Sequence, residues 1–195
     1  MTMKRVCVFC GSSDGARPAY RQAAEGLVHA LARRGLGVVF GGGGIGLMNV
    51  MADAALGLGI EVIGVIPEAL VAKELAHRGL SDMRVVHSMH ERKALMAELA
   101  DAFVALPGGF GTLEEFCEVL TWAQLGLHRK PCGLLNVAAY FDPLLAFFDH
   151  AQAERFLRSE HRAMVLVDSD PSRLVDRLAA FQPPDLDKWI RPDEA

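Results

Sequence analysis

The chain has 195 residues, of which 51% are hydrophobic and 23% charged, a composition that suits one compact globular domain and excludes disorder except at the end of the chain. The net charge of −4 excludes a general attraction to nucleic acid or anionic membrane, so any phosphate would have to bind at a local site. No apolar run approaches the roughly 20 residues of a membrane span and the N-terminal stretch has no signal-peptide pattern, which indicates a cytoplasmic protein that binds neither nucleic acid nor membrane.

Apolar runs rich in Val and Ile alternate with segments of helical periodicity, and each junction carries Gly, Pro or Ser. Strands are expected at 4–10, 37–41, 61–66, 83–87, 102–106, 132–136 and 163–167. Helices are expected at 18–34, 46–58, 68–78, 89–100, 112–127, 142–154 and 171–181. This alternation predicts an α/β fold over 1–181, a single-domain, Rossmann-like, doubly wound parallel sheet of about seven strands with helices on both faces. Residues 182–195 are expected to form a C-terminal extension.

The first expected strand contains Cys7 and Cys10 and ends in a turn of small residues at 10–15. A Cys-x-x-Cys pair can be redox-active or half of a zinc site, but this pair lies along a strand and no second pair completes a zinc set. We therefore expect reduced core thiols and no metal. In the turn, backbone N–H groups of Gly11 and Ser12 can face an anion, although such residues are also ordinary loop and N-cap residues.

Four consecutive glycines, 41–44, follow the second expected strand and precede a helix. Glycine repeats cost conformational entropy, so they indicate positive φ or close backbone approach, which a phosphate near Gly42 and Gly43 would explain. An alternative is the dinucleotide fingerprint G-x-G-x-x-G at 41, 43 and 46 with Glu61 twenty residues later, which predicts an oxidoreductase. Against it, Glu61 begins its strand and faces the opposite edge of the sheet, and the glycines follow the second strand instead of the first.

A helix expected directly after the fourth strand begins with a group of charged side chains. Its Arg92 is the residue type best suited to clamp phosphate or ribose oxygens with two parallel donors. His90 could act as a base, but a lone His at a helix start is more often a surface or capping residue. Glu74, earlier in the chain, has the spacing to pair with Arg78, and the residues alone leave any further role undecided.

The third turn runs from Pro107 to Thr112, after the fifth expected strand, and opens a helix. Gly108, Gly109 and Gly111 can expose successive N–H groups to phosphate oxygens, and the threonine can add a hydroxyl donor. The turn lacks the Lys and Ser/Thr of a Walker A loop, so hydrolysis of ATP by a P-loop is not expected.

Glu114 and Glu115 stand in the first turn of the helix that follows these glycines. Carboxylates at this position favour the helix dipole and can simply be caps. A phosphate-binding turn should nevertheless avoid two nearby negative charges. We therefore favour a role toward the sugar or the base, where a carboxylate can hydrogen-bond hydroxyls or stabilise a cationic transition state.

Three motifs of the chain occur together in one known family. They are Gly41-Gly42-Gly43, Met89-His90-x-Arg92-Lys93 and Pro107-Gly108-Gly109-x-Gly111-Thr112-x-x-Glu115. With these motifs the chain resembles the Lonely Guy family, the cytokinin riboside 5′-monophosphate phosphoribohydrolases, which are also described as possible lysine decarboxylases. The similarity runs from Val6 to about Phe148 and includes the segments 121–126 and 133–136.

The resemblance implies hydrolysis of the N-glycosidic bond of a nucleoside 5′-monophosphate, with release of an adenine-type base and ribose 5-phosphate. It also implies a homodimer that uses no metal and no nicotinamide cofactor. Arg92 and Glu115 would be the catalytic pair. The substrate would be lined by Gly11, Ser12, Gly42, Gly43, Glu74, Met89, Lys93, Pro107, Gly108, Gly109, Gly111, Thr112, Glu114 and Thr121.

The expected mechanism combines the residues and the resemblance. The glycine turns and Lys93 would hold the phosphate, Glu115 would orient or deprotonate a water that attacks C1′, and Arg92 would position the ribose phosphate or polarise the base. The chain departs from plant members at two places. Glu91 in the arginine motif should matter little if its side chain faces solvent, and the segment 75–79 affects the expected base pocket. A dinucleotide-dependent oxidoreductase and a non-catalytic nucleotide or cofactor carrier remain the alternatives.

Overall fold

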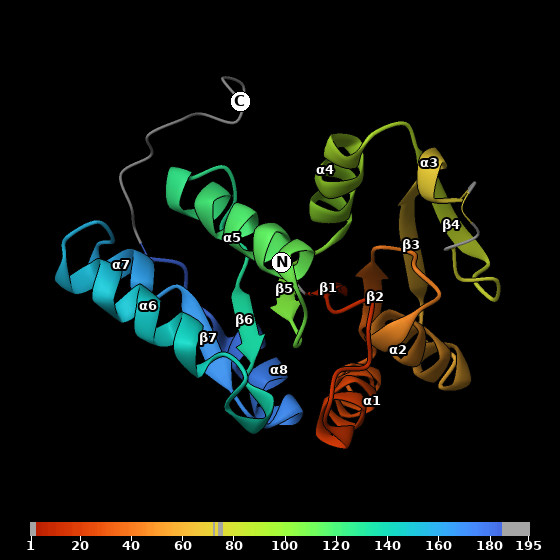
Figure 1. Ribbon diagram of the computed structural model, residues 1–195, viewed down its shortest axis with the longest axis horizontal. Coiled ribbons are helices and arrows are strands. Elements are labelled where there is room, and N and C mark those ends of the chain that lie inside the picture. Colours follow the sequence, from red (N-terminus) through yellow and green to blue (C-terminus); the bar gives the residue numbers. More distant parts are fainter. Residues whose placement is uncertain (1–2, 72, 74–75, 185–195) are drawn as a thin grey trace.

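Seven parallel strands form one sheet in the order β4-β3-β2-β1-β5-β6-β7 (Figure 1). The computed structural model describes residues 3–71, 73 and 76–184. The strands are β1 (Arg5–Phe9), β2 (Gly37–Phe40), β3 (Val62–Pro67), β4 (Asp82–Val86), β5 (Ala102–Ala105), β6 (Cys132–Leu135) and β7 (Val165–Asp168). The predicted α/β fold with a doubly wound parallel sheet is therefore confirmed.

Helices cover both faces of this sheet (Figure 1). They are α1 (Pro18–Ala32), α2 (Gly46–Gly57), α3 (Glu68–Val71), α4 (Met89–Leu99), α5 (Phe110–Leu125), α6 (Asp142–Ala153), α7 (Ser159–Arg162) and α8 (Pro171–Ala180), with a 3-10 turn η1 (Val137–Ala139). Helices α1, α2 and α8 bury their apolar side chains on one face, and α4 and α5 bury theirs on the other.

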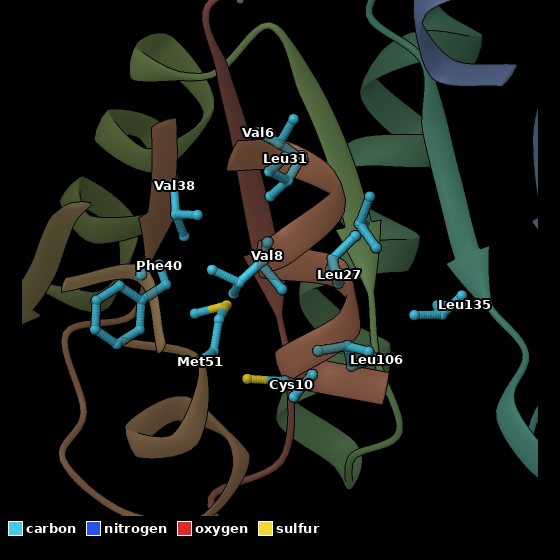
Figure 2. Packing of buried hydrophobic residues seen from close by; sticks show 14 of the residues in the cluster. Val6, Val8, Cys10, Leu27, Leu31, Val38, Phe40, Met51, Leu106 and Leu135 are labelled. Carbon is cyan, nitrogen blue, oxygen red and sulfur yellow. The ribbon is translucent and has the colours of Figure 1, made fainter. Parts of the chain in front are cut away.

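The alternation of side chains along the central strand β1 divides the core into two layers. Val6 and Val8 belong to the layer that also contains the α1 residues Leu27 and Leu31, as Figure 2 shows. The intervening Cys7 and Phe9 belong to the opposite layer, beneath α4 and α5. Because both faces of a parallel strand are buried, β1 is a continuous apolar run and not an alternating one.

The direction of winding reverses beside β1. The chain adds β2, β3 and β4 on one side of β1, and then β5, β6 and β7 on the other. In doubly wound sheets the crevice at such a reversal, at the carboxyl ends of the strands, is where ligands bind. The turns after β1, β2 and β5 all open at this end, so the fold itself brings the three glycine turns together.

The expected helix at 68–78 is wrong beyond its first turn. Helix α3 ends at Val71, and Ala76 instead forms a β-bridge with Gly43. The backbone N–H of His77 donates to Gly42 O at 2.9 Å. Pairing with the glycine turn thus overrides the helical propensity of this segment.

Two further expectations concern the ends of the chain and the membrane. Residues 185–195 of the predicted C-terminal extension lie outside the described residues, and Arg129 donates to the carbonyl of Pro184 at 3.4 Å. Within the described ranges, no helix has both the length and the apolar character required to cross a membrane.

Candidate active site

The three glycine turns surround a cavity of about 390 Å³ at the carboxyl ends of β1, β2 and β5. Its wall consists of Cys10, Gly11, Ser12, Gly41, Gly43, Ile45, Met48, Ile66, Leu70, Arg92, Gly109, Phe110, Gly111, Thr112 and Glu115. From the predicted site, the structure brings Gly11, Ser12, Gly43, Arg92, Gly109, Gly111, Thr112 and Glu115 together here.

The first and third turns are joined backbone to backbone. Gly11 N donates to Pro107 O at 3.0 Å. A Cβ on Gly108 would lie 2.1 Å from Thr112 Oγ1 and 2.8 Å from Gly11 N, so only glycine fits there. Thr112 is buried, and the residues at the start of α5 line the cavity with it. The first N–H groups of a helix have no partner within the helix and can bind an anion.

The second turn is joined to the first in a similar way. Leu47 N donates to Gly11 O at 3.1 Å. A Cβ on Gly46 would lie 2.3 Å from the carbonyl carbon of Ser12, and the φ of Gly46 is +57°. Close approach of backbone to backbone therefore explains this glycine.

Arg92 enters the cavity from the first turn of α4, whose start is firmly capped. Ser88 Oγ accepts from Glu91 N at 3.1 Å, and Glu91 Oε2 accepts from His87 N at 2.8 Å. Glu91 is thus engaged at the helix end, by the cap Ser88 and by the N–H of the residue before it. The buried guanidinium of Arg92 donates from Nε to Val65 O at 3.0 Å, so it is fixed to the end of β3.

Gly41, at the end of β2, makes room for this guanidinium. Arg92 Nη2 donates to Gly41 O at 3.3 Å, and a Cβ on Gly41 would lie 1.7 Å from the same Nη2. The first of the four glycines is therefore required by an arginine side chain.

Glu115 pairs with Arg92 in the wall of the cavity. Arg92 Nη1 lies 3.1 Å from Glu115 Oε1, and the two side chains are 10% and 11% exposed. Burial raises the pKa of Glu115, an effect that the adjacent positive charge of Arg92 opposes. The arrangement places a partly desolvated carboxylate, held by one oxygen, beside the N-terminus of a helix.

Comparison with known proteins places this geometry in a family. The family of possible lysine decarboxylases matches residues 48–178. A cytokinin riboside 5′-monophosphate phosphoribohydrolase of Rhodococcoides fascians is 55% identical over 87% of this chain and 86% of its own. One from Arabidopsis thaliana is 47% identical over 92% of this chain and 83% of its own. The chain belongs to the Lonely Guy family.

Solved structures support the fold of this Lonely Guy protein. The molybdenum cofactor carrier protein of Chlamydomonas reinhardtii has a TM-score of 0.70 at 21% identity, covering 92% of this chain and 99% of that one. A molybdenum cofactor binding protein of Rippkaea orientalis has a TM-score of 0.69 at 20% identity, covering 92% and 98%. At these identities the likeness is one of fold alone.

Lys93 and Glu114 were both predicted to line the substrate, but neither belongs to the wall of the active-site cavity. Lys93 Nζ is 2.6 Å from Glu114 Oε1 and 2.9 Å from Glu118 Oε1. The hydrogen bond with Glu114 raises the pKa of Lys93. The lysine thus bridges α4 to α5, and a role toward phosphate stays a prediction.

Other predicted residues also lie apart from the cavity. Met89 is exposed, with its Sδ 3.9 Å from Arg92 Nη1. Thr121 Oγ1 donates to Cys117 O at 2.8 Å, and the residue lines a separate cavity between α5, α6 and α7. Gly42 lies behind the wall at a φ of +69°, and Glu74 falls outside the described residues. Pro107 and Gly108 line a neighbouring cavity that is described below.

The sequence reasoning missed one side of the cavity. Ile45, Met48, Ile66 and Leu70 form an apolar wall on the side of α2 and β3. In the sequence these residues cannot be distinguished from core residues, because apolar side chains at a strand end or a helix start fit either environment.

The acidic residue of the dinucleotide alternative lies elsewhere. Glu61 directly precedes β3, and its Oε2 is 2.8 Å from Arg5 Nε, at the amino ends of the strands. A ribose bound at the glycine turns would lie at the carboxyl ends of the strands, on the opposite side of the sheet from Glu61. The oxidoreductase alternative is therefore not supported.

Replacing Gly41 by Ala tests whether the second turn serves the guanidinium. Gly41 is absent from the residues of positive φ, so the substitution adds a methyl group without backbone strain. We expect it to displace Arg92 and to lower turnover about 100-fold in the assay described below, with a normal circular dichroism spectrum. Gly57→Ala is the matched control, because a Cβ there would meet nothing within 4 Å. Normal turnover by Gly41→Ala would contradict this account.

Proposed function

We propose that this Lonely Guy protein hydrolyses the N-glycosidic bond of nucleoside 5′-monophosphates and releases a free base and ribose 5-phosphate. The observation that carries the proposal is the buried pair of Arg92 and Glu115, which shares one cavity with the N-terminus of α5. Relatives that are 47–55% identical over most of the chain bear the name of this activity. The alternatives, redox chemistry and passive carriage, have no such support.

The phosphate is proposed to bind at the start of α5. Gly109 and Gly111 carry no side chains, and Thr112 adds a hydroxyl group to their N–H groups. The N-terminus of a helix carries a partial positive charge that attracts anions. An anchored phosphate fixes the ribose, and so C1′, relative to the catalytic pair.

Glu115 is proposed to act on the water that attacks C1′. One carboxylate oxygen is engaged by Arg92, which leaves the other free to accept a proton from that water. As the water oxygen bonds to C1′, the N-glycosidic bond breaks, and the base leaves with the electron pair and takes up a proton. The carboxylate also stabilises the positive charge that develops on the sugar ring.

The apolar wall is proposed to receive the base. Ile45, Met48, Ile66 and Leu70 offer an adenine ring, or an alkyl group on its N6, a surface without charge. The relatives are named for cytokinin ribosides, so we propose N6-substituted adenine nucleotides as substrates, with AMP as the unsubstituted comparison.

The proposal is tested by incubating the protein with AMP and with an N6-prenyl AMP and measuring the free base by chromatography. We expect base and ribose 5-phosphate in equal amounts from the unaltered protein, and a loss of at least about 100-fold for Glu115→Gln, which keeps the shape but not the charge. A protein that only carried nucleotides would bind AMP without releasing base. No free base from either substrate would refute the hydrolase.

The acid limb of the pH profile tests the role of Glu115. Because burial raises its pKa above the ordinary value of 4.5, the carboxylate becomes protonated at a higher pH than an exposed glutamate does. Turnover should therefore be full above this pKa and fall as the pH drops through it, with a midpoint above 4.5. A limb at or below 4.5 in plots of kcat/KM against pH, which report groups of the free enzyme, would speak against Glu115 as the base.

We also propose that the protein is a homodimer joined through the face formed by α5, α6 and α7. A cavity of about 240 Å³ on this face contains Thr121, and Phe156 beside it is 90% exposed. A two-fold interface places the same patch of each subunit against the other. Such contact would bury Phe156. It would also explain why Thr121, a predicted substrate residue, lies apart from the active-site cavity of its own chain.

We place the protein in the cytoplasm. All four cysteines are free, and Cys7, Cys10 and Cys132 are buried. Burial raises the pKa of the Cys132 thiol to about 12, which keeps it protonated and unreactive. Unpaired cysteines are typical of a reducing compartment.

Phe156→Glu tests the dimer. A charge on the proposed interface should convert the dimer to a monomer in analytical ultracentrifugation, because an unpaired buried carboxylate is costly. Leu58→Glu is the control, since Leu58 is an exposed apolar residue at the end of α2. Helix α2 lies at the other side of the molecule from α6 and α7 in Figure 1. A monomeric unaltered protein, or a dimer that Phe156→Glu leaves intact, would contradict the proposal.

A further inference from the structure

A second cavity of about 310 Å³ adjoins the active site, and the two share Gly11, Ser12 and Gly109 in their walls. Tyr140, from the segment between η1 and α6, lines this second cavity only. Its hydroxyl donates to the carbonyl oxygen of Gly108 at 2.6 Å. A side chain from outside the three glycine turns thus binds the backbone of the third turn.

This hydrogen bond fixes a peptide plane. In a trans peptide the C=O and N–H groups point in opposite directions. With the Gly108 carbonyl directed at Tyr140, the N–H of Gly109 is turned away from Tyr140. Gly109 lies in the wall of both cavities, whereas Tyr140 lines only the second and Arg92 and Glu115 line only the active site. We propose that Tyr140 is a positioning residue that orients the Gly108–Gly109 peptide so that its N–H faces the phosphate of the substrate.

The peptide needs such a partner because both of its residues are glycines. Glycine accepts positive and negative φ about equally, so the plane between Gly108 and Gly109 can rotate with little steric hindrance. A rotated plane would present a carbonyl oxygen to the phosphate where a donor should be, and two acceptors repel each other. The hydroxyl of Tyr140 holds the carbonyl on the other side.

The loop that carries Tyr140 is strained in a way that supports this role. Ala138 and Ala139 have φ values of 51° and 61°, in the left-handed region that favours glycine. Asn136 holds the loop in this shape, because its Oδ1 accepts from Phe141 N at 2.8 Å and its Nδ2 donates to Asp142 Oδ1 at 2.7 Å. Backbone strain persists where the surroundings enforce it, and it is concentrated at functional sites.

The ring of Tyr140 is fixed independently of its hydroxyl group. It meets the ring of Tyr20 edge to face, with centroids 5.6 Å apart and an interplanar angle of 76°. It also packs edge to face against the ring of Phe141, with centroids 5.1 Å apart and an interplanar angle of 87°. Removal of the hydroxyl oxygen alone should therefore leave the ring in place and free the Gly108–Gly109 peptide.

Tyr140→Phe tests the inference through the binding of phosphate-bearing ligands. The positioning role of Tyr140 rests on the proposed function, because the phosphate in question is that of the nucleotide substrate. We expect the KM for AMP and the dissociation constant of ribose 5-phosphate, measured by calorimetry, each to rise about tenfold. The inhibition constant of free adenine and kcat should change less than about threefold, a split that general loosening of the fold would not produce.

Tyr20→Phe is the matched control, because it removes a hydroxyl group from the same cavity but keeps the ring contact. We expect it to bind ribose 5-phosphate like the unaltered protein. If base is released but Tyr140→Phe leaves the affinity for ribose 5-phosphate unchanged, the positioning role is wrong and the hydrolase stands. If no base is released but ribose 5-phosphate binds and Tyr140→Phe weakens it, the positioning role stands without the hydrolase. An unaltered protein that does not bind ribose 5-phosphate would overturn the positioning role.

Discussion

The site depends on one buried guanidinium. Arginine keeps its charge at any accessible pH, so its burial requires partners for its N–H groups. Arg92 finds them in the carbonyl oxygens of Val65 and Gly41 and in the carboxylate of Glu115. These partners come from the ends of β3 and β2 and from α5. A single side chain therefore links three elements that are far apart in sequence, and α4 buries an arginine where a helix normally buries an apolar residue.

The ion pair is better explained by chemistry than by stability. Removing two charges from water costs free energy that their mutual attraction often fails to recover, and apolar residues of similar size frequently stabilise a fold more. The pair of Arg92 and Glu115 is almost buried, so it carries this desolvation cost. It also lines a cavity, so a ligand can reach it. Burial and Arg92 act on the pKa of Glu115 in opposite directions. The carboxylate is thus held in place without being fully neutralised.

The sequence was sufficient for the sheet and for the three turns, because apolar runs and glycines at strand ends have direct physical meanings. It also singled out Arg92 and Glu115, whose side chains the structure brings together in one cavity. It was insufficient where the conformation or role of a residue depends on contact with a residue distant in sequence. Within the expected helix at 68–78, Ala76 and His77 pair with the glycine turn instead, and Gly41 makes room for an arginine side chain. Periodicity could have separated Glu115 from Glu114, since consecutive helical residues point about 100° apart and only one can face the cavity.

At the proposed phosphate site, backbone dipoles are the main source of attraction that the described residues offer an anion. The chain carries a net charge of −4, the charge of Arg92 is balanced by Glu115, and Lys93 is engaged by Glu114 and Glu118. Dipoles attract only when they are aimed, so the orientation of each N–H group matters more here than at a site built from lysines. Glycine gives the turns the close approach they need, but it also leaves their peptides free to rotate. The proposed phosphate site therefore needs rigid neighbours, and the contacts that join Gly11 to Pro107 and Tyr140 to Gly108 supply them.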